Sequence, residues 1–289
     1  MPRGVYPRKP KAQKLQGQVD KLLRVQQAQA PLVVETDEEI EAKLTERFEV
    51  LADMTQGAVD GDIRAMIVSG PGGLGKSYTV DKTLAGWDPE ASDYTIVKGY
   101  VKTPSLYKLL YNHREHGQVL VLDDADSIFS DDTSINLLKA ACDSSEKRVI
   151  SYLSEFILID DETAERLPKR FEFNGTIIFI TNMDFDALID RGHKLAPHLE
   201  ALVSRAHYID MAMKTQRDYL VQIRLKVKAG LLENIGLDAD GQADVVEFIE
   251  KNYTRLRELS LRMALKIGSI RRRNRGNWER QARVTCFKN

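Results

Sequence analysis

The stretch SGPGGLGKSYTV, residues 69–80, limits the possible folds more than any other feature of the sequence. It fits the pattern GxxxxGK[ST], which here runs from Gly70 to Ser77. Glycines have no Cβ, so successive backbone N–H groups can turn toward one centre and approach phosphate oxygens closely. The helix expected to begin near Lys76 directs its positive end to the same point. The sequence therefore predicts a polyphosphate-binding loop between a strand and a helix.

The bound nucleotide is expected to contact the whole length of this loop. Lys76 is predicted to reach the β and γ phosphates, and Ser77 to hold Mg²⁺. The sequence has no NKxD-like motif for guanine, so ATP with Mg²⁺ is the predicted ligand pair. The alternative is a glycine-rich turn without a ligand. The residues predicted to contact the nucleotide are Gly70, Pro71, Gly72, Gly73, Leu74, Gly75, Lys76, Ser77 and Tyr78.

A P-loop needs a second acidic position for its metal, and VLVLDDAD at residues 119–126 supplies one. Asp123 ends an apolar strand and is predicted to contact Mg²⁺ through water. Asp124 is predicted to polarise the attacking water. Asp126 lies beyond the strand and is predicted to cap the following turn.

Apolar runs alternate with helical patterns between residues 64 and 211, which predicts an α/β domain with a mainly parallel sheet covered on both faces. A first helix is expected after Thr36 as its N-cap, and three amphipathic helices after Met213. The predicted strands are 64–70, 94–99, 118–124, 148–153, 176–182 and 206–211, with helices at 76–87, 105–116 and 134–144. The predicted domains are a basic, mostly disordered arm at 1–35, an α/β nucleotide-binding domain at 36–213, a small helical domain at 214–272 and a basic tail at 273–289.

The formal net charge of -1 conceals two basic ends. Lys and Arg side chains crowd residues 1–25 and 271–289, each beside a single acid, Asp20 or Glu279. Such ends are typical of DNA contact, although tails that aid solubility are an equal alternative. No apolar run is long enough to cross a membrane and no secretory signal precedes the fold, so a soluble cytoplasmic protein is expected, in the host cytoplasm if the chain is phage-encoded.

With TIIFITN, LVSRAHYID and LSLRMAL downstream of these motifs, the sequence resembles the AAA+ ATPase family over roughly residues 36–270. It is most similar to the compact members, some of them phage-encoded, that are grouped near clamp loaders and helicase loaders. The resemblance implies a parallel-sheet P-loop core with a helical lid at 214–272. The family usually has Asp-Glu where this chain has Asp123 and Asp124. This departure from the family is compatible with slow or partner-dependent hydrolysis, and catalysis is still expected because the other positions are filled.

The resemblance assigns roles to three further residues. Asn182, after the strand IIFIT, is expected to orient the attacking water, with an ordinary turn-starting Asn as the alternative. Arg205 is expected to act in trans on a neighbour's γ phosphate, which implies a homo-oligomer in a ring or open ring. Arg262 in the helical domain is expected to sense the nucleotide, although Arg255 and Arg257 are near enough in sequence to be alternatives.

Two segments are candidates for gripping a client. Lys98, Tyr100 and Lys102 lie where threading members of the family place a pore loop, and could hold DNA or a polypeptide; a Tyr that packs at the helix start is the alternative. Residues 148–173 are expected to form an inserted hairpin that faces a pore or partner, or is only an extra edge element.

Three functions remain open from the sequence. The first is an oligomeric ATPase that remodels or loads proteins on DNA, for instance in DNA replication. The second is a protein-remodelling or unfolding motor. The third is an ATP-gated DNA-binding module with little turnover.

Overall fold

The structure is a computed structural model of the chain, and it describes residues 35–155, 157–160 and 163–288. The predicted basic arm at 1–35 lies almost entirely outside the described residues. Helix α2 (Asp37–Val59) begins where the sequence placed its N-cap. The Thr36 hydroxyl accepts a hydrogen bond from the Glu39 N–H at 3.2 Å, and the Glu39 carboxylate accepts one from the Thr36 N–H at 2.8 Å. This reciprocal pair is a capping box, which satisfies two donors at the start of the helix.

The central sheet has five strands in the order β2-β3-β6-β1-β7. Each pairing between neighbouring strands is parallel, so the predicted parallel sheet is confirmed. The strands are β1 (Ala65–Ser69), β2 (Tyr94–Lys98), β3 (Val119–Asp123), β6 (Thr176–Thr181) and β7 (His207–Asp210).

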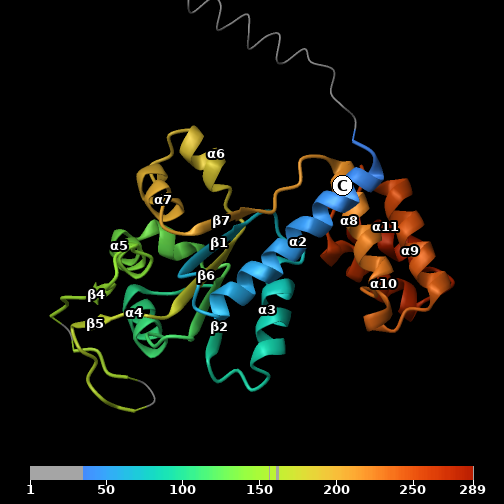
Figure 1. The fold of residues 1–289 in the computed structure, drawn as a ribbon. Helices are drawn as coiled ribbons and strands as arrows, with labels where there is room; N and C mark the ends of the chain where they lie inside the picture. The colour runs from blue at the N-terminus through green and yellow to red at the C-terminus, as the bar shows by residue number, and fades with distance from the viewer. Residues whose placement is uncertain (1–34, 156, 161–162, 289) are drawn as a thin grey trace, which may run out of the picture. The chain divides into compact units, whose positions relative to one another are not determined.

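Helices cover both faces of this sheet, as Figure 1 shows. Successive strand residues point to opposite faces: Ile67 packs in one buried cluster, while Met66 and Val68 pack in the other. The first cluster includes residues of α4 (Thr103–Asn112), α5 (Asp132–Ala141), α6 (Phe185–Asp190) and α7 (Ala196–Val203), and the second includes residues of α2 and α3 (Lys76–Trp87). The short helices α6 and α7 had no counterpart among the predicted elements.

The carboxyl ends of the parallel strands gather polar residues at one edge of the sheet. Ser69 ends β1, Lys98 ends β2 and Asp123 ends β3, while Asn182 directly follows β6. Ligands of open parallel sheets bind at this edge, because loops and helix N-termini converge there. The fold therefore brings three of the residues that the sequence singled out, Lys98, Asp123 and Asn182, to one edge of the sheet.

The insert at 148–173 contains a small antiparallel hairpin, as expected. Strands β4 (Val149–Ser151) and β5 (Arg170–Glu172) form a two-stranded sheet separate from the main one. A single antiparallel bridge between Ile159 and Arg166 continues the pairing.

A helical domain with its own apolar core follows the sheet. It comprises α8 (Gln216–Lys228), the short 3-10 helix η2 (Glu233–Ile235), α9 (Ala239–Asn252), α10 (Leu261–Arg273) and α11 (Trp278–Cys286). The fold is thus an α/β P-loop core with a parallel sheet, followed by a helical C-terminal domain.

Helix α11 corrects the prediction of a basic tail at 273–289. Trp278, Ala282 and Cys286 recur at intervals of four, which places them on one face of the helix, and all three are buried in the helical core. The Trp278 and Phe248 rings lie 5.1 Å apart between centroids. The high arginine content of this segment hides the apolar stripe, because only one residue in four belongs to it.

Several arginines at the C-terminal end are paired with acids from elsewhere in the helical domain. Arg271 lies 2.7 Å from Asp244, and Arg275 lies 2.6 Å from Asp238. Counting only acids close in sequence overestimated the free positive charge at this end. In the part of the chain that the structure describes, no helix is both long and apolar enough to span a bilayer.

Candidate active site

The glycine-rich loop connects the end of β1 to the first turn of α3. Gly73 has φ +76°, a left-handed conformation that favours glycine, and a Cβ there would lie 2.9 Å from the Ser260 Cβ. Gly70 has φ +145°, and its Cβ would meet the Met211 backbone at 3.0 Å. Both positions therefore need glycine, for backbone conformation and for space. Helix α3 begins at Lys76, so its N-terminal N–H groups face the loop.

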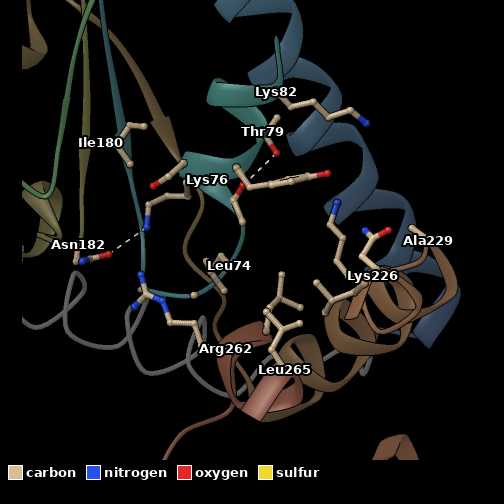
Figure 2. A pocket seen from close by; sticks show the side chains of 18 of the residues that line it. Leu74, Lys76, Thr79, Lys82, Ile180, Asn182, Lys226, Ala229, Arg262 and Leu265 are labelled. Atoms are coloured by element: carbon tan, nitrogen blue, oxygen red, sulfur yellow. Dashed lines mark hydrogen bonds between the residues drawn. The ribbon is translucent and has the colours of Figure 1, made fainter. Parts of the chain in front are cut away.

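A cavity of about 530 Å³ opens over this loop. Residues 72–79, Asp124 and Asn182 form its α/β wall. Its helical wall comes from the helical domain and includes Lys226, Leu231, Ile235, Leu261, Arg262 and Leu265. In Figure 2, Lys76, Asn182 and Arg262 converge at one end, and Lys226 and Leu265 lie on the helical side. The volume suits a small-molecule ligand such as a nucleotide.

Lys76 is buried, with 5% of its surface exposed. Its ammonium donates hydrogen bonds to the carbonyls of Gly70 and Pro71, at 2.5 and 2.9 Å, and to Asn182 Oδ1 at 3.1 Å. Burial lowers the pKa of Lys76 to about 8, because desolvation penalises the charged form more than nearby aspartates favour it. The ammonium is thus held at the loop by weak neutral acceptors, which phosphate oxygens can replace with stronger charge-assisted bonds.

Ser77 and Asp123 present oxygens to each other beside the loop. The Ser77 hydroxyl donates to Asp123 Oδ1 at 2.9 Å, and Asp123 is 4% exposed. A hydroxyl and a carboxylate oxygen at this spacing fit the preference of Mg²⁺ for oxygen ligands. The described residues contain no cluster of three or more His, Cys, Asp or Glu side chains that could hold a metal. A magnesium ion here would therefore take its remaining ligands from phosphate oxygens and water.

Asp124 and Asn182 form a second polar pair at the cavity. Asn182 Nδ2 donates to Asp124 Oδ1 at 2.7 Å, while Asn182 Oδ1 accepts from Lys76. Asp124 has φ +53°, an uncommon conformation for a residue other than glycine, and its N–H donates to the Ile180 carbonyl at 2.9 Å. The strand ends thus hold the Asp124 carboxylate at the cavity wall, two hydrogen bonds from the lysine ammonium.

Asp126 does not cap the following turn, contrary to the prediction. The 3-10 helix η1 (Asp126–Ser130) has Ala125 as its N-cap and no side-chain cap. Asp126 instead accepts a hydrogen bond from the Thr181 hydroxyl at 2.6 Å. Burial raises the pKa of Asp126, and this hydrogen bond partly offsets the rise. The Asp126 carboxylate therefore binds the end of strand β6, and not the local turn to which the sequence assigned it.

Arg262 is the arginine of the helical domain that reaches the loop. It lies in the first turn of α10, after the N-cap Ser260, whose hydroxyl accepts from the Met263 N–H at 3.1 Å. A Cβ on Gly72 would lie 3.2 Å from an Arg262 guanidinium nitrogen. Of the two alternatives, Arg255 stacks over the Phe287 ring at 4.7 Å, and neither it nor Arg257 lines the cavity.

Two contacts to the loop backbone were not foreseen from sequence. The buried amide of Gln222 donates to the Leu74 carbonyl at 3.2 Å, and the Leu261 N–H donates to the Gly73 carbonyl at 3.0 Å. The helical domain thus binds the loop directly. A glutamine inside the apolar sequence LVQI of α8 was the available signal, since a buried polar side chain needs a partner.

Arg205 does not face the cavity of its own chain. Its Nε lies 3.7 Å from Asp143 Oδ2, and a guanidinium nitrogen donates to the Ala201 carbonyl at 2.6 Å. The arginine is exposed just before β7. This placement leaves its predicted action on a neighbouring subunit as a proposal.

The structure separates the three residues of the candidate pore loop. Lys98 turns toward the strand ends, where its Nζ lies 3.7 Å from Asp123 Oδ2. Tyr100 is 74% exposed, and Lys102 is exposed directly before α4. Tyr100 therefore does not pack at the helix start, but a gripping role for it remains a prediction.

Comparison with known sequences identifies one relative. No protein-family model matches the chain. The chain is 37% identical, over 249 residues, to the "uncharacterized 36.7 kDa protein in nrdC-mobD intergenic region" of Enterobacteria phage T4. The match covers 86% of this chain and 75% of the phage T4 protein.

Comparison with solved structures finds more distant likenesses. The chain is similar to NtrX from Brucella abortus in complex with ADP, at 15% identity and a TM-score of 0.44, over 98% of this chain and 58% of NtrX. The Thermotoga maritima RuvB branch migration motor gives 18% identity and a TM-score of 0.43, over 82% and 62%. Domain III of Thermotoga maritima DnaA gives 11% and 0.47, over 85% and 92%. The chain spans less than two thirds of the NtrX and RuvB chains.

Proposed function

The chain belongs to the family of the phage T4 36.7 kDa protein, and from this premise and the geometry of the cavity we propose that it binds ATP with Mg²⁺ and hydrolyses the ATP. One observation carries the proposal. The glycine loop, the buried Lys76, Ser77, the Asn182–Asp124 pair and Arg262 all line a single cavity, and Asp123 is hydrogen-bonded to Ser77 beside it. Few reactions other than phosphoryl transfer need this set of groups at the end of a parallel sheet.

Each group has a distinct task in the proposed reaction. The loop N–H groups and Lys76 bind the phosphates, while Ser77 and Asp123 would hold Mg²⁺, which neutralises phosphate charge when bound. Asp124 polarises the attacking water. Asn182 orients that water and the Asp124 carboxylate. The water oxygen forms a bond to the γ phosphorus as the bond to the β–γ bridging oxygen breaks, giving ADP and phosphate. Arg262 contacts the phosphates from the helical wall.

We further propose that the active form is a homo-oligomer, in a ring or open ring. Arg205 is exposed and lies outside the cavity of its own chain, so it is available to a neighbouring subunit once its pair with Asp143 opens. Such an arginine placed at a neighbour's γ phosphate stabilises the charge that develops there. This would make hydrolysis dependent on assembly.

The proposed client is DNA, or a protein that is remodelled or loaded on DNA. Support comes from residues 1–25, which contain many basic side chains and one acidic side chain, Asp20. The C-terminal arginines give less support, because acids of the helical domain pair with several of them. A protein-remodelling motor is the alternative that the exposed Tyr100 favours. Either activity would take place in the cytoplasm, of a host cell if the chain is phage-encoded.

A second function, an ATP-gated DNA-binding module with little turnover, is favoured by one observation. Asp124 has a short side chain, and Asn182 already hydrogen-bonds one of its oxygens. A carboxylate in that position reaches the attacking water less readily than the longer glutamate expected from the AAA+ resemblance.

Steady-state ATP hydrolysis separates these functions. Purified full-length chain is assayed alone, with duplex DNA, with single-stranded DNA and with an unfolded protein. Stimulation by DNA supports the first proposal, whereas stimulation by unfolded protein alone replaces it with a protein-remodelling motor. ATP binding without turnover under every condition would favour the gated module, and an absence of ATP binding would overturn all three.

A further inference from the structure

Lys98 and Asp123 lie next to each other at the ends of neighbouring strands. They are partners in the parallel register of β2 and β3. The Lys98 ammonium lies 3.7 Å from Asp123 Oδ2, while Asp123 Oδ1 accepts the hydrogen bond from Ser77. The two oxygens of this buried carboxylate are thus engaged by a cation and by the hydroxyl of the proposed metal site.

We propose that Lys98 is a positioning residue for the metal site. Without Mg²⁺, its ammonium pairs with the Asp123 carboxylate, and it leaves that carboxylate when Mg²⁺ binds. The inference rests on the proposed function. A buried carboxylate is costly without a nearby positive charge, and the lysine supplies one at low cost because its own side chain is 65% exposed. Mg²⁺ carries twice the charge and attracts the same carboxylate, so it and the ammonium compete for Asp123. A displaced Lys98 has open solvent to enter.

This exchange has a direct path to the exposed Tyr100. The N–H of Gly99 donates to the Asp123 carbonyl at 3.1 Å, so the residue after Lys98 is bound to the same aspartate. Gly99 has φ +91°, and among the described residues other than its two chain neighbours no heavy atom lies within 4 Å of where its Cβ would be. On the other side, Val101 is buried, with 5% of its surface exposed. Tyr100 thus lies between Gly99 and the buried Val101. The Gly99 backbone is hydrogen-bonded to Asp123, so movement of Lys98 changes the surroundings of Tyr100.

Three proteins test the competition: the full-length wild type, Lys98→Met and the control Lys102→Met. Lys102 is exposed nearby on the same loop, and it forms no ion pair with any of the residues that the structure describes. Each is titrated with Mg²⁺ in the presence of a fluorescent, non-hydrolysable ATP analogue, and the midpoint of the Mg²⁺-dependent signal is recorded. Lys98→Met is expected to lower the Mg²⁺ midpoint by about 1.5- to fivefold, the range for a largely exposed ion pair, while Lys102→Met leaves it unchanged.

The link to the loop has its own readout. Cys142 and Cys286 are buried, so a Tyr100→Cys variant can be labelled at one site with an environment-sensitive dye. Addition of Mg²⁺ to the nucleotide-bound protein should shift the dye emission, and Lys98→Met should abolish that shift.

The outcomes distinguish this inference from the proposed function. Equal Mg²⁺ midpoints in all three proteins would overturn the role of Lys98 while nucleotide binding stands. So would an equal change of the Mg²⁺ midpoint in Lys98→Met and Lys102→Met. The same dye shift with and without Lys98 would overturn the link to Tyr100. Failure of the wild type to bind the analogue at all would instead remove the proposed function, and this inference with it.

Discussion

The two walls of the cavity differ in the kinds of residues that form them. The α/β wall consists of backbone N–H groups and of charged or amide side chains near the strand ends. Lys76 hydrogen-bonds to Asn182, and Asn182 hydrogen-bonds to Asp124. The helical wall consists mainly of aliphatic side chains, and Lys226 and Arg262 are its charged residues. The first wall is equipped for phosphate chemistry and the second for covering the ligand. Substitutions in the two walls should therefore fail in different ways.

The largest effect is expected from Asp124→Asn on the α/β wall. The amide keeps the shape but cannot attract the water proton, so hydrolysis should fall by about 10²- to 10⁴-fold while ATP binding persists. Single-turnover hydrolysis and equilibrium binding on the same preparation measure the two separately. Unaltered turnover would show that another residue polarises the water.

Lys76→Ala should remove binding itself. The variant loses a buried ammonium directed at the phosphates, which costs about 2–5 kcal/mol, or roughly 30-fold to several thousand-fold in affinity. Calorimetric titration with ATP measures the loss, and circular dichroism checks that the fold is intact. The exposed Lys102→Ala serves as a matched control, and an equal loss in both variants would contradict a special role for Lys76.

Arg262→Ala on the helical wall should have a smaller effect. Loss of a charge-assisted contact to phosphate costs about 1.5–3 kcal/mol, which corresponds to roughly ten- to 100-fold weaker ATP binding. Arg255→Ala is the control, because Arg255 stacks on Phe287 away from the cavity. If Arg255→Ala weakened ATP binding and Arg262→Ala did not, the assignment of the nucleotide-sensing arginine would be reversed.

The pH dependence of ATP affinity should be smaller still near neutrality. The pKa of Lys76 is lowered by burial from 10.5 to about 8, so the free protein loses the ammonium as the pH rises through 8. Phosphate binding needs the protonated lysine, so affinity should fall by up to about tenfold per pH unit above 8. Between pH 8 and 10.5 the unfolded chain holds a proton that the folded chain lacks, so this group makes unfolding less favourable as pH rises.

Calorimetric titrations from pH 7 to pH 9.5 measure this trend. The Lys76→Arg variant keeps its charge over that range and should show a flatter profile. A wild-type affinity that stays constant through pH 9.5 would contradict the proposed role of the Lys76 ammonium in phosphate binding.

The α/β wall was largely predictable from sequence, and the reason is physical. A glycine loop between a strand and a helix needs a local pattern that can be read directly, and acids at a strand end must lie at the carboxyl edge of a parallel sheet. The sequence therefore placed Lys76, Asp123 and Asn182 at one edge without coordinates. Their assigned roles stay predictions until they are measured.

The helical wall and the cross-strand pairs could not be read in this way. Gln222 binds the Leu74 carbonyl and Asp126 binds Thr181 across more than fifty residues, so neither partner appears in the local sequence. The pairing of Lys98 with Asp123 depends on the β2–β3 register, which the strand predictions did not include. Helix α11 was missed because its apolar stripe of Trp278, Ala282 and Cys286 is sparse among arginines.

The most direct test of the central claim, that this cavity holds ATP between its two walls, is photolabelling with 8-azido-ATP followed by peptide mapping. The account predicts label on peptides from the cavity walls, within residues 72–82 or 226–235, and loss of that label with excess unlabelled ATP. Label confined to other regions, or a protein that retains no label, would contradict it.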